Sequence, residues 1–346
     1  MTIITILYFI LILGIIVFVH EFGHFIFAKR AGIYVYEFSL GMGPRLFKFK
    51  RKNDETTYAI RALPIGGFVQ LAGEDPEADK GIPKDKRLQS KTWMQRLLTM
   101  AAGVTMNFIL AIVILFIIAL CNGVSLDTRY VTEVNQEVYT NLVDGDKIIK
   151  VNGHKVNNYD KLALEIAASK NYEFDMVVVS KDNVKKKVHV KAKKVKDEDK
   201  NTTYDFGFKL TGNKKKGLLV SLQYAFLKFF STIEQMIFTL IYLFTGRLSV
   251  KMLSGPVGLY SVVGQAANGG IFNILSLIAL FSINVGFINI LPFPAFDGGW
   301  VMFLIIEKIK GRPVKDKTIA ILNTIGFYLL MLLMVYITFN DILKFF

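Results

Sequence analysis

Four long stretches of this 346-residue chain contain no charged side chain, and they restrict the possible folds more than any other feature. They cover residues 1–19, 97–126, 252–296 and 318–340. A helix needs about 20 mostly apolar residues to cross a bilayer, so each stretch is long enough for a span. A composition of 52% hydrophobic and 20% charged residues excludes a disordered or fibrous chain. The sequence therefore predicts a polytopic α-helical membrane protein.

The charged loops predict how the chain is oriented. We expect the first helix at residues 3–28, retained because it lacks a basic leader and a small-residue cleavage site. The loop 29–96 holds fourteen Lys and Arg against eight Asp and Glu, and the link 307–317 holds five against two. Positive charge in short loops marks the cytoplasmic side of a membrane protein. Both loops are therefore predicted to face the cytosol.

Three further spans follow from this assignment. They are expected at residues 97–122, 271–295 and 318–340, which makes four transmembrane helices and leaves both termini extracytoplasmic. Residues 217–246 are apolar but contain Lys228 and Glu234, which a buried span would have to accommodate. For residues 217–246 an amphipathic or partly inserted pair of helices is preferred to a fifth span, although a fifth span stays open. Residues 214–270 as a whole are expected to form amphipathic or partly inserted membrane-associated helices.

The extracytoplasmic segment 125–213 is predicted to be a small inserted α/β domain. Strands are expected at residues 147–151, 174–179 and 184–190, and a helix at 159–169. The pair Asn152–Gly153 is typical of a tight hairpin turn. No catalytic cluster is recognisable in this segment, and its two histidines, His154 and His189, are expected at the surface.

The net charge of +14 does not indicate a nucleic-acid-binding protein. The basic residues flank the apolar stretches instead of alternating with aromatic residues in a recognisable module. Anionic membrane lipids are therefore the expected partners of these residues, and no nucleic acid is expected. The single cysteine, Cys121, excludes an internal disulfide and a cysteine-based metal site. The oligomeric state cannot be predicted from these features.

The chemistry is concentrated in the first apolar helix, which contains His20-Glu21-Phe22-Gly23-His24. Residues four apart share one face of a helix, so the two imidazoles can bind one zinc ion while Glu21 serves as the base. Ionisable groups at membrane depth are costly, which favours a functional site over two interfacial histidines. A catalytic zinc site needs a third protein ligand.

The best candidate for that ligand is Asp297, at the inner end of the third apolar stretch. It lies in the sequence Asn289-Ile-Leu-Pro-Phe-Pro-Ala-Phe-Asp297-Gly-Gly. Two prolines and two glycines around a carboxylate predict a broken helix whose backbone lines a cavity. His24 and Asp297 both fall at the cytoplasmic ends of their predicted helices, so their depths agree.

These motifs resemble the site-2 protease family of intramembrane zinc metalloproteases, in the bacterial branch that carries a PDZ domain. The resemblance rests on the His-Glu-x-x-His motif and on the Asn-x-x-Pro-x-x-x-x-Asp-Gly motif at 289–298. Supporting matches lie at residues 38–44, 62–69 and 254–258, and residues 142–153 resemble the core of a PDZ domain.

The resemblance implies a role for each matching residue. His20, His24 and Asp297 would bind Zn²⁺, and Glu21 would be the catalytic base. The residues that would position the substrate are Asn289, Gly66, Gly67 and Asn107. Departures from the family pattern are Phe296 before the Asp-Gly pair, Val104 after Gly103, and Val138-Tyr-Thr-Asn at the start of the PDZ-like segment. The last departure concerns peptide binding by the PDZ groove more than the fold.

The expected function is cleavage of transmembrane segments of single-span membrane proteins by zinc-activated water. Residues 33–73 predict β-hairpins that dip toward the membrane, and an exposed strand edge could hold an unwound substrate. The resemblance implies that the PDZ domain admits substrates only after another protease has shortened them. It also suggests anti-sigma factors and remnants of signal peptides as substrates. The two competing interpretations are an ion transporter, for which no inverted repeat is visible, and an inactive scaffold, which would not need Glu21.

Overall fold

The computed structural model describes residues 3–73, 78–196, 202–249 and 255–343. The chain divides into two compact units, the first formed by residues 1–114 together with 253–346 and the second by residues 115–252. Ser254, part of one of the supporting motifs, lies outside the described residues.

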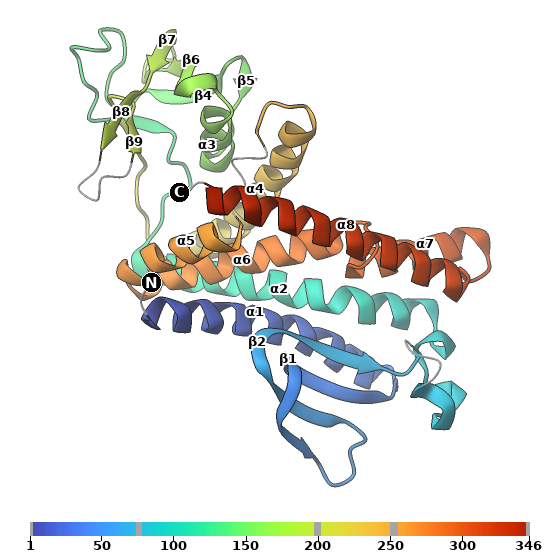
Figure 1. Cartoon of the computed structure of the whole chain (residues 1–346). Helices are drawn as coiled ribbons and strands as arrows, with labels where there is room; N and C mark the ends of the chain where they lie inside the picture. Colours follow the sequence, from blue (N-terminus) through green and yellow to red (C-terminus); the bar gives the residue numbers. More distant parts are fainter. Residues whose placement is uncertain (1–2, 74–77, 197–201, 250–254, 344–346) are drawn as a thin grey trace. The chain divides into compact units, whose positions relative to one another are not determined.

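The first unit is built from apolar helices and one β-hairpin (Figure 1). Its elements are α1 (Ile3–Arg30), β1 (Val35–Lys50), β2 (Thr57–Leu71), the 3₁₀ turns η1 (Ala78–Gly81), η2 (Lys84–Lys86) and η3 (Leu88–Ser90), most of α2 (Trp93–Asn122), α5 (Pro256–Asn268), α6 (Ile271–Ile290), α7 (Asp297–Lys310) and α8 (Asp316–Leu343). Helix α6 is the most deeply packed of the candidate spans, because half of its most apolar 18-residue segment is buried. The metal-site residues predicted above all belong to this unit.

Five helices in the described residues are long and apolar enough to cross a membrane, so the expected number of four is not confirmed. The additional candidate is α4 (Leu218–Phe244), a continuous helix of 27 residues where the sequence suggested a pair of helices. The third predicted span is also shorter than expected, because α6 ends at Ile290 instead of residue 295. Pro292 and Pro294 follow immediately, and proline is incompatible with the interior of a helix.

The predicted β structure between α1 and α2 is confirmed as a single long antiparallel hairpin. Its two strands are bent, so that the first half of β1, residues 35–40, pairs with residues 67–71 on one side and with residues 57–60 on the other. The second half of β1 pairs with the start of β2. The hairpin packs against α1 (Figure 1).

One hydrophobic cluster connects the hairpin with three helices of the first unit. Its buried members come from α1, the hairpin and its flanking turns, α2 and α7: Ala28, Ile33, Val35, Leu71, Leu88, Met100 and Leu304. At its edge the Trp93 indole N–H donates to the Leu304 carbonyl (2.8 Å), and Arg96 pairs with Glu307 (2.7 Å). The start of α2 is thus fixed to α7, the helix that begins with Asp297.

The second unit contains an antiparallel sheet, α3 and α4 (Figure 1). Its elements are β3 (Tyr130–Thr132), β4 (Lys147–Val151), β5 (His154–Lys155), α3 (Tyr159–Ala167), the 3₁₀ turn η4 (Lys170–Tyr172), β6 (Glu173–Val179), β7 (Lys185–Lys191), β8 (Lys193–Lys196), β9 (Thr202–Asp205), β10 (Lys209–Thr211) and α4. The strand order is β10-β3-β4-β6-β7, with β5 on β4, and β8 pairs with β9 separately.

The predicted elements of this domain are confirmed within one or two residues. Strands at 147–151, 173–179 and 185–191 and the helix at 159–167 were all expected. Asn152 and Gly153 have φ of 48° and 81°, the left-handed conformation of a tight hairpin turn. Alternating residues of β6 and β7 point into a core that includes Phe174, Met176 and Val188. His189 is exposed, as expected for a surface histidine.

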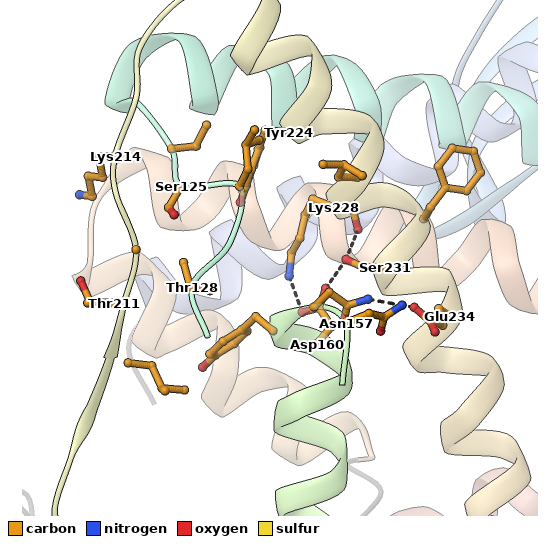
Figure 2. Close-up of a pocket in the computed structure, with 18 of the residues that line it drawn as sticks. Ser125, Thr128, Asn157, Asp160, Thr211, Lys214, Tyr224, Lys228, Ser231 and Glu234 are labelled. Carbon is orange, nitrogen blue, oxygen red and sulfur yellow. Dashed lines mark hydrogen bonds and ion pairs between the residues drawn. The ribbon is translucent and has the colours of Figure 1, made fainter. Parts of the chain in front are cut away.

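Polar contacts join α4 to α3 within the second unit (Figure 2). Lys228 pairs with Asp160 (2.5 Å), which also accepts a hydrogen bond from Ser231. The Asn158 amide donates to Glu234 (2.9 Å). These two charged residues of α4 therefore have protein partners, next to a cavity of about 830 Å³.

A second polar cluster lies further along the same two helices. Glu165 of α3 is fully buried and accepts hydrogen bonds from Tyr242 and Arg247, and it pairs with Lys161 (3.1 Å). The Lys161 ammonium lies 3.1 Å from the centroid of the Phe238 ring. Helix α3 is thus attached to α4 over most of the length of both helices.

Candidate metal centre

The His-Glu-x-x-His motif lies on a regular part of α1, as expected. His20 and His24 are one helical turn apart, and their Nε2 atoms are separated by 3.3 Å. The side chains are 11% and 12% exposed. Both imidazoles therefore point to a common, largely buried position.

Asp297, the first residue of α7, completes this cluster. Its Oδ2 atom lies 3.1 Å from Nε2 of His20 and 3.2 Å from Nε2 of His24. The three ligand atoms lie within 4.8 Å of one another. Residues that are 273 positions apart (297 − 24) are thus brought together as the sequence predicted.

The irregular segment between α6 and α7 explains why Asp297 is preceded by prolines and followed by glycines. A Cβ atom on Gly298 would lie 2.2 Å from the Leu291 carbonyl oxygen, and one on Gly299 would lie 2.5 Å from that of Phe293. Only glycine allows the segment to fold back so closely onto the first turn of α7. Ala295 adopts a left-handed φ of 76°, and its N–H donates to the Asn323 side chain of α8 (3.3 Å).

One face of α2 covers the cluster with residues spaced four apart. The Thr99 carbonyl oxygen lies 2.8 Å from Nδ1 of His24. A Cβ atom on Gly103 would lie 2.3 Å from Nε2 of His24 and 2.8 Å from Nε2 of His20. The side chain of Asn107 reaches Nδ1 of His20, at 3.3 Å from its Nδ2. Residues 99, 103 and 107 share a helix face because each is about one turn from the next.

The residues at this position fit a zinc ion. Ligand atoms in a tetrahedral zinc site lie about 2.0–2.2 Å from the ion, which places them about 3.3–3.5 Å from one another. The three separations here are 3.1–3.3 Å. The Asp297 Oδ2 atom is buried without a hydrogen bond from the described residues. Two imidazoles and one carboxylate are a usual ligand set for catalytic zinc.

Glu21 lies between the cluster and the hairpin. A Cβ atom on Gly67 of β2 would lie 3.3 Å from Cγ of Glu21, 3.1 Å from Val17 and 2.8 Å from the Ser39 carbonyl oxygen. Glu21 and strand β2 are therefore in direct contact, and a side chain at residue 67 would push them apart. Gly66 next to it has a φ of 84° and lies against Met42.

The remaining predicted site residues differ in how closely they contact the cluster of His20, His24 and Asp297. Asn289 lies in the last turn of α6 and is partly exposed, and no hydrogen bond joins its side chain to the described residues. Asn107 is fully buried and contacts His20, one of the predicted metal ligands. Substrate contact therefore stays a prediction for Asn289, Gly66, Gly67 and Asn107.

Sequence reasoning did not identify three residues around the cluster. Thr99 offers a backbone carbonyl, Gly103 gives the imidazoles room, and Ser282 of α6 donates to the Asn107 carbonyl (2.9 Å). The four-residue spacing of Thr99, Gly103 and Asn107 was a visible signal that these residues share a face. No comparable signal marked Ser282.

Comparisons with known proteins agree with this geometry. The model of "Peptidase family M50" matches residues 8–333. The chain is 34% identical to zinc metalloprotease RasP of Bacillus licheniformis and 33% identical to regulator of sigma-W protease RasP of Bacillus subtilis. Zinc metalloprotease RasP of Shouchella clausii is 34% identical. In each case the similarity covers 99% of both chains.

Proposed function

The chain belongs to peptidase family M50 and is a zinc metalloprotease, and from this premise we propose that it cleaves the membrane-spanning segments of single-span membrane proteins. The observation that carries the proposal is the meeting of His20, His24 and Asp297 within a set of apolar, membrane-type helices.

The three ligands and Glu21 divide the chemistry between them. His20, His24 and Asp297 would hold Zn²⁺, which when bound would act as a Lewis acid toward the scissile carbonyl and the attacking water. The Glu21 carboxylate would accept a proton from that water as it attacks the carbonyl carbon. It would then return the proton to the leaving amide nitrogen when the C–N bond breaks. Each hydrolysis thus consumes one water and leaves Glu21 ionised again.

The β-hairpin is suited to presenting the substrate. Residues 67–70 of β2 pair with β1 along one edge, and a Cβ atom on Gly67 would lie 3.3 Å from Cγ of Glu21. A peptide bond in an intact helix is shielded, so the substrate has to be unwound locally. An unwound segment could add as a further strand along the edge of residues 67–70 that does not face β1, held by main-chain hydrogen bonds. Its scissile bond would then lie close to Glu21.

Helix α4 supports a topology with four crossings. Its Lys228, Glu234 and Tyr242 side chains, together with Arg247 just after the helix, bind α3 and its N-cap residue Asn158, which belong to a hydrophilic domain. Hydrocarbon does not accommodate such a domain, so this length of α4 would lie outside the membrane core. Its exposed apolar residues include a set spaced three, four or seven positions apart, which would rest on the bilayer: Leu219, Leu222, Phe226, Phe230, Ile237, Ile241 and Phe244.

With four crossings, both termini and the 125–213 domain would be extracytoplasmic, and the metal centre would lie toward the cytoplasmic side. The antiparallel sheet and α3 of this domain are compatible with the predicted PDZ domain, which would act as a gate for substrates already shortened by another protease. One relative is named regulator of sigma-W protease. By similarity, a membrane-anchored anti-sigma factor is the first substrate class to test, ahead of signal-peptide remnants.

The proposal is tested with the purified full chain in liposomes and single-span substrates of two kinds, with and without a folded ectodomain. Mass spectrometry of the products locates the cut. Cleavage of the shortened substrate within its apolar segment, abolished by a zinc chelator and restored by added Zn²⁺, is the expected result. Equal cleavage of both substrates would contradict the gate alone, whereas cuts confined to residues outside the apolar segment would contradict intramembrane cleavage.

A further inference from the structure

Both the side chain and the backbone carbonyl of Asn107 make polar contacts with neighbouring helices. Its side chain is fully buried, with Nδ2 at 3.3 Å from Nδ1 of His20, and its backbone carbonyl accepts a hydrogen bond from Ser282 Oγ (2.9 Å). Ser282 is itself fully buried on α6. Asn107 thus connects α6, through α2, with a metal ligand on α1.

The amide of Asn107 has one unused group. Its Oδ1 atom is buried without a hydrogen-bond partner among the described residues. A half-turn of the amide exchanges Oδ1 and Nδ2 without changing its shape. In that orientation Oδ1 accepts the Nδ1–H proton of His20, which leaves the Nε2 lone pair of His20 directed at the cluster.

The neighbouring ligand uses the same arrangement. Nδ1 of His24 lies 2.8 Å from the Thr99 carbonyl oxygen, which can only accept a hydrogen bond. Nδ1 of His24 is therefore the donor, and its Nε2 is free to bind metal. Thr99 and Asn107 are two turns apart on one face of α2, so this face offers one acceptor to each histidine.

We propose that Asn107 is a positioning residue for the metal site, which fixes the ring orientation and tautomer of His20 instead of contacting substrate. The inference rests on the proposed function in that the bound ion is Zn²⁺. Hydrogen-bonding partners of this kind typically contribute 10–100-fold to metal affinity.

The test compares Asn107→Leu, which removes the acceptor at similar volume, with Asn107→Asp, which keeps it. Zinc affinity is measured for the full chain in detergent by competition with a chelator, and the visible spectrum of the cobalt-substituted protein reports the ligand geometry. Asn107→Leu is expected to weaken zinc binding about 10–100-fold and to change the cobalt spectrum. Asn107→Asp is expected to bind zinc at least as tightly as the wild type. The matched control is Asn284→Leu, because Asn284 only donates to the Leu280 carbonyl of its own helix (2.9 Å).

Wild-type zinc affinity and cobalt spectrum in Asn107→Leu would overturn the inference. Equal weakening in Asn107→Leu and Asn107→Asp would also overturn it, because the amide would then act as a donor or by packing alone. A wild type that binds zinc but does not cleave any single-span substrate would contradict the proposed function while the affinity ratios still decide the role of Asn107. A wild type without zinc would overturn both.

Discussion

Helices α1 and α4 both place ionisable side chains within apolar sequence, and they use them in opposite ways. In α4, Lys228 and Glu234 are paired with Asp160 and Asn158 of α3. In α1, His20 and His24 meet a carboxylate whose buried Oδ2 has no hydrogen bond from the described residues. Charge in an apolar helix is therefore not sufficient to indicate chemistry. Ligand atoms that converge and keep unused lone pairs are the better indication.

The contrast between α1 and α4 would fail most clearly if one of the proposed ligands in the α1 cluster were dispensable for zinc binding. Asp297→Ala removes the only carboxylate among the three ligands, so zinc content and cleavage are both expected to be lost. Metal analysis of the purified protein and cleavage of a shortened single-span substrate measure the two effects. Lys228→Met is the matched control from α4 and should retain its zinc. Stoichiometric zinc in Asp297→Ala would contradict the assigned ligand set.

The next largest effect is expected when the packing of α2 against His20 and His24 is disturbed. Gly103→Ala introduces a Cβ atom 2.3 Å from Nε2 of His24, so the ring has to move and zinc affinity is expected to fall at least about 10-fold. Gly14→Ala on α1 is the control, since a Cβ atom there meets nothing within 4 Å. Chelator competition measures both variants. Equal zinc affinity in the two variants would show that α2 does not confine the site.

Loss of the ion pair between Lys228 of α4 and Asp160 of α3 should lower the stability of the second unit but should not change zinc binding. Lys228→Met leaves the largely buried Asp160 without its cation, which is expected to cost about 1–3 kcal/mol of unfolding free energy in the second unit. A double-mutant cycle with Asp160→Asn isolates the pair. Lys214→Met, which changes an exposed lysine at the same cavity, is the control. An additive cycle would indicate that the charges on α4 are not committed to α3.

The smallest predicted effect is the pH dependence of the second polar cluster between α3 and α4, around Glu165. Burial alone would raise the pKa of Glu165, but hydrogen bonds from Tyr242 and Lys161 prevail and hold this pKa below its ordinary value of 4.5. A carboxyl with a lowered pKa stabilises the fold above its unfolded value and loses that contribution as pH falls through the folded value. The second unit should therefore unfold at progressively lower temperatures as the pH falls below about 4.5.

Glu165→Gln is the control for this titration, because it cannot ionise. The variant should lack the part of the acid dependence that Glu165 contributes. If the wild type and Glu165→Gln lose stability in parallel between pH 5 and pH 3, the lowered pKa is not a source of stability here.

Local patterns were sufficient to predict the α1 motif and most of the small domain. The spacing of His20 and His24 is set by one helical turn, and Asn152–Gly153 adopts the turn that these residue types favour. Asp297 was predictable because prolines and glycines interrupt an otherwise apolar stretch. In each case the signal lies within about ten residues of the feature that it predicts.

The features that escaped prediction depend on distant partners. The role of Lys228 in α4 is decided by Asp160, which is 68 residues away, and that of Glu234 by Asn158, 76 residues away. Without these partners, the two charges appeared only as obstacles to a membrane span. Asn107 likewise meets His20 from 87 residues away, so no local pattern could distinguish a contact with the metal site from a contact with substrate.

The most direct test of the central claim is the cleavage of a shortened single-span substrate by the wild type and by Glu21→Gln, with zinc content measured in the same preparations. Because Glu21 is the proposed base and not a ligand, the account predicts equal zinc in both proteins and cleavage by the wild type alone. Undiminished cleavage by Glu21→Gln at equal zinc would contradict the assigned chemistry. Loss of zinc in Glu21→Gln would contradict the separation between ligands and base.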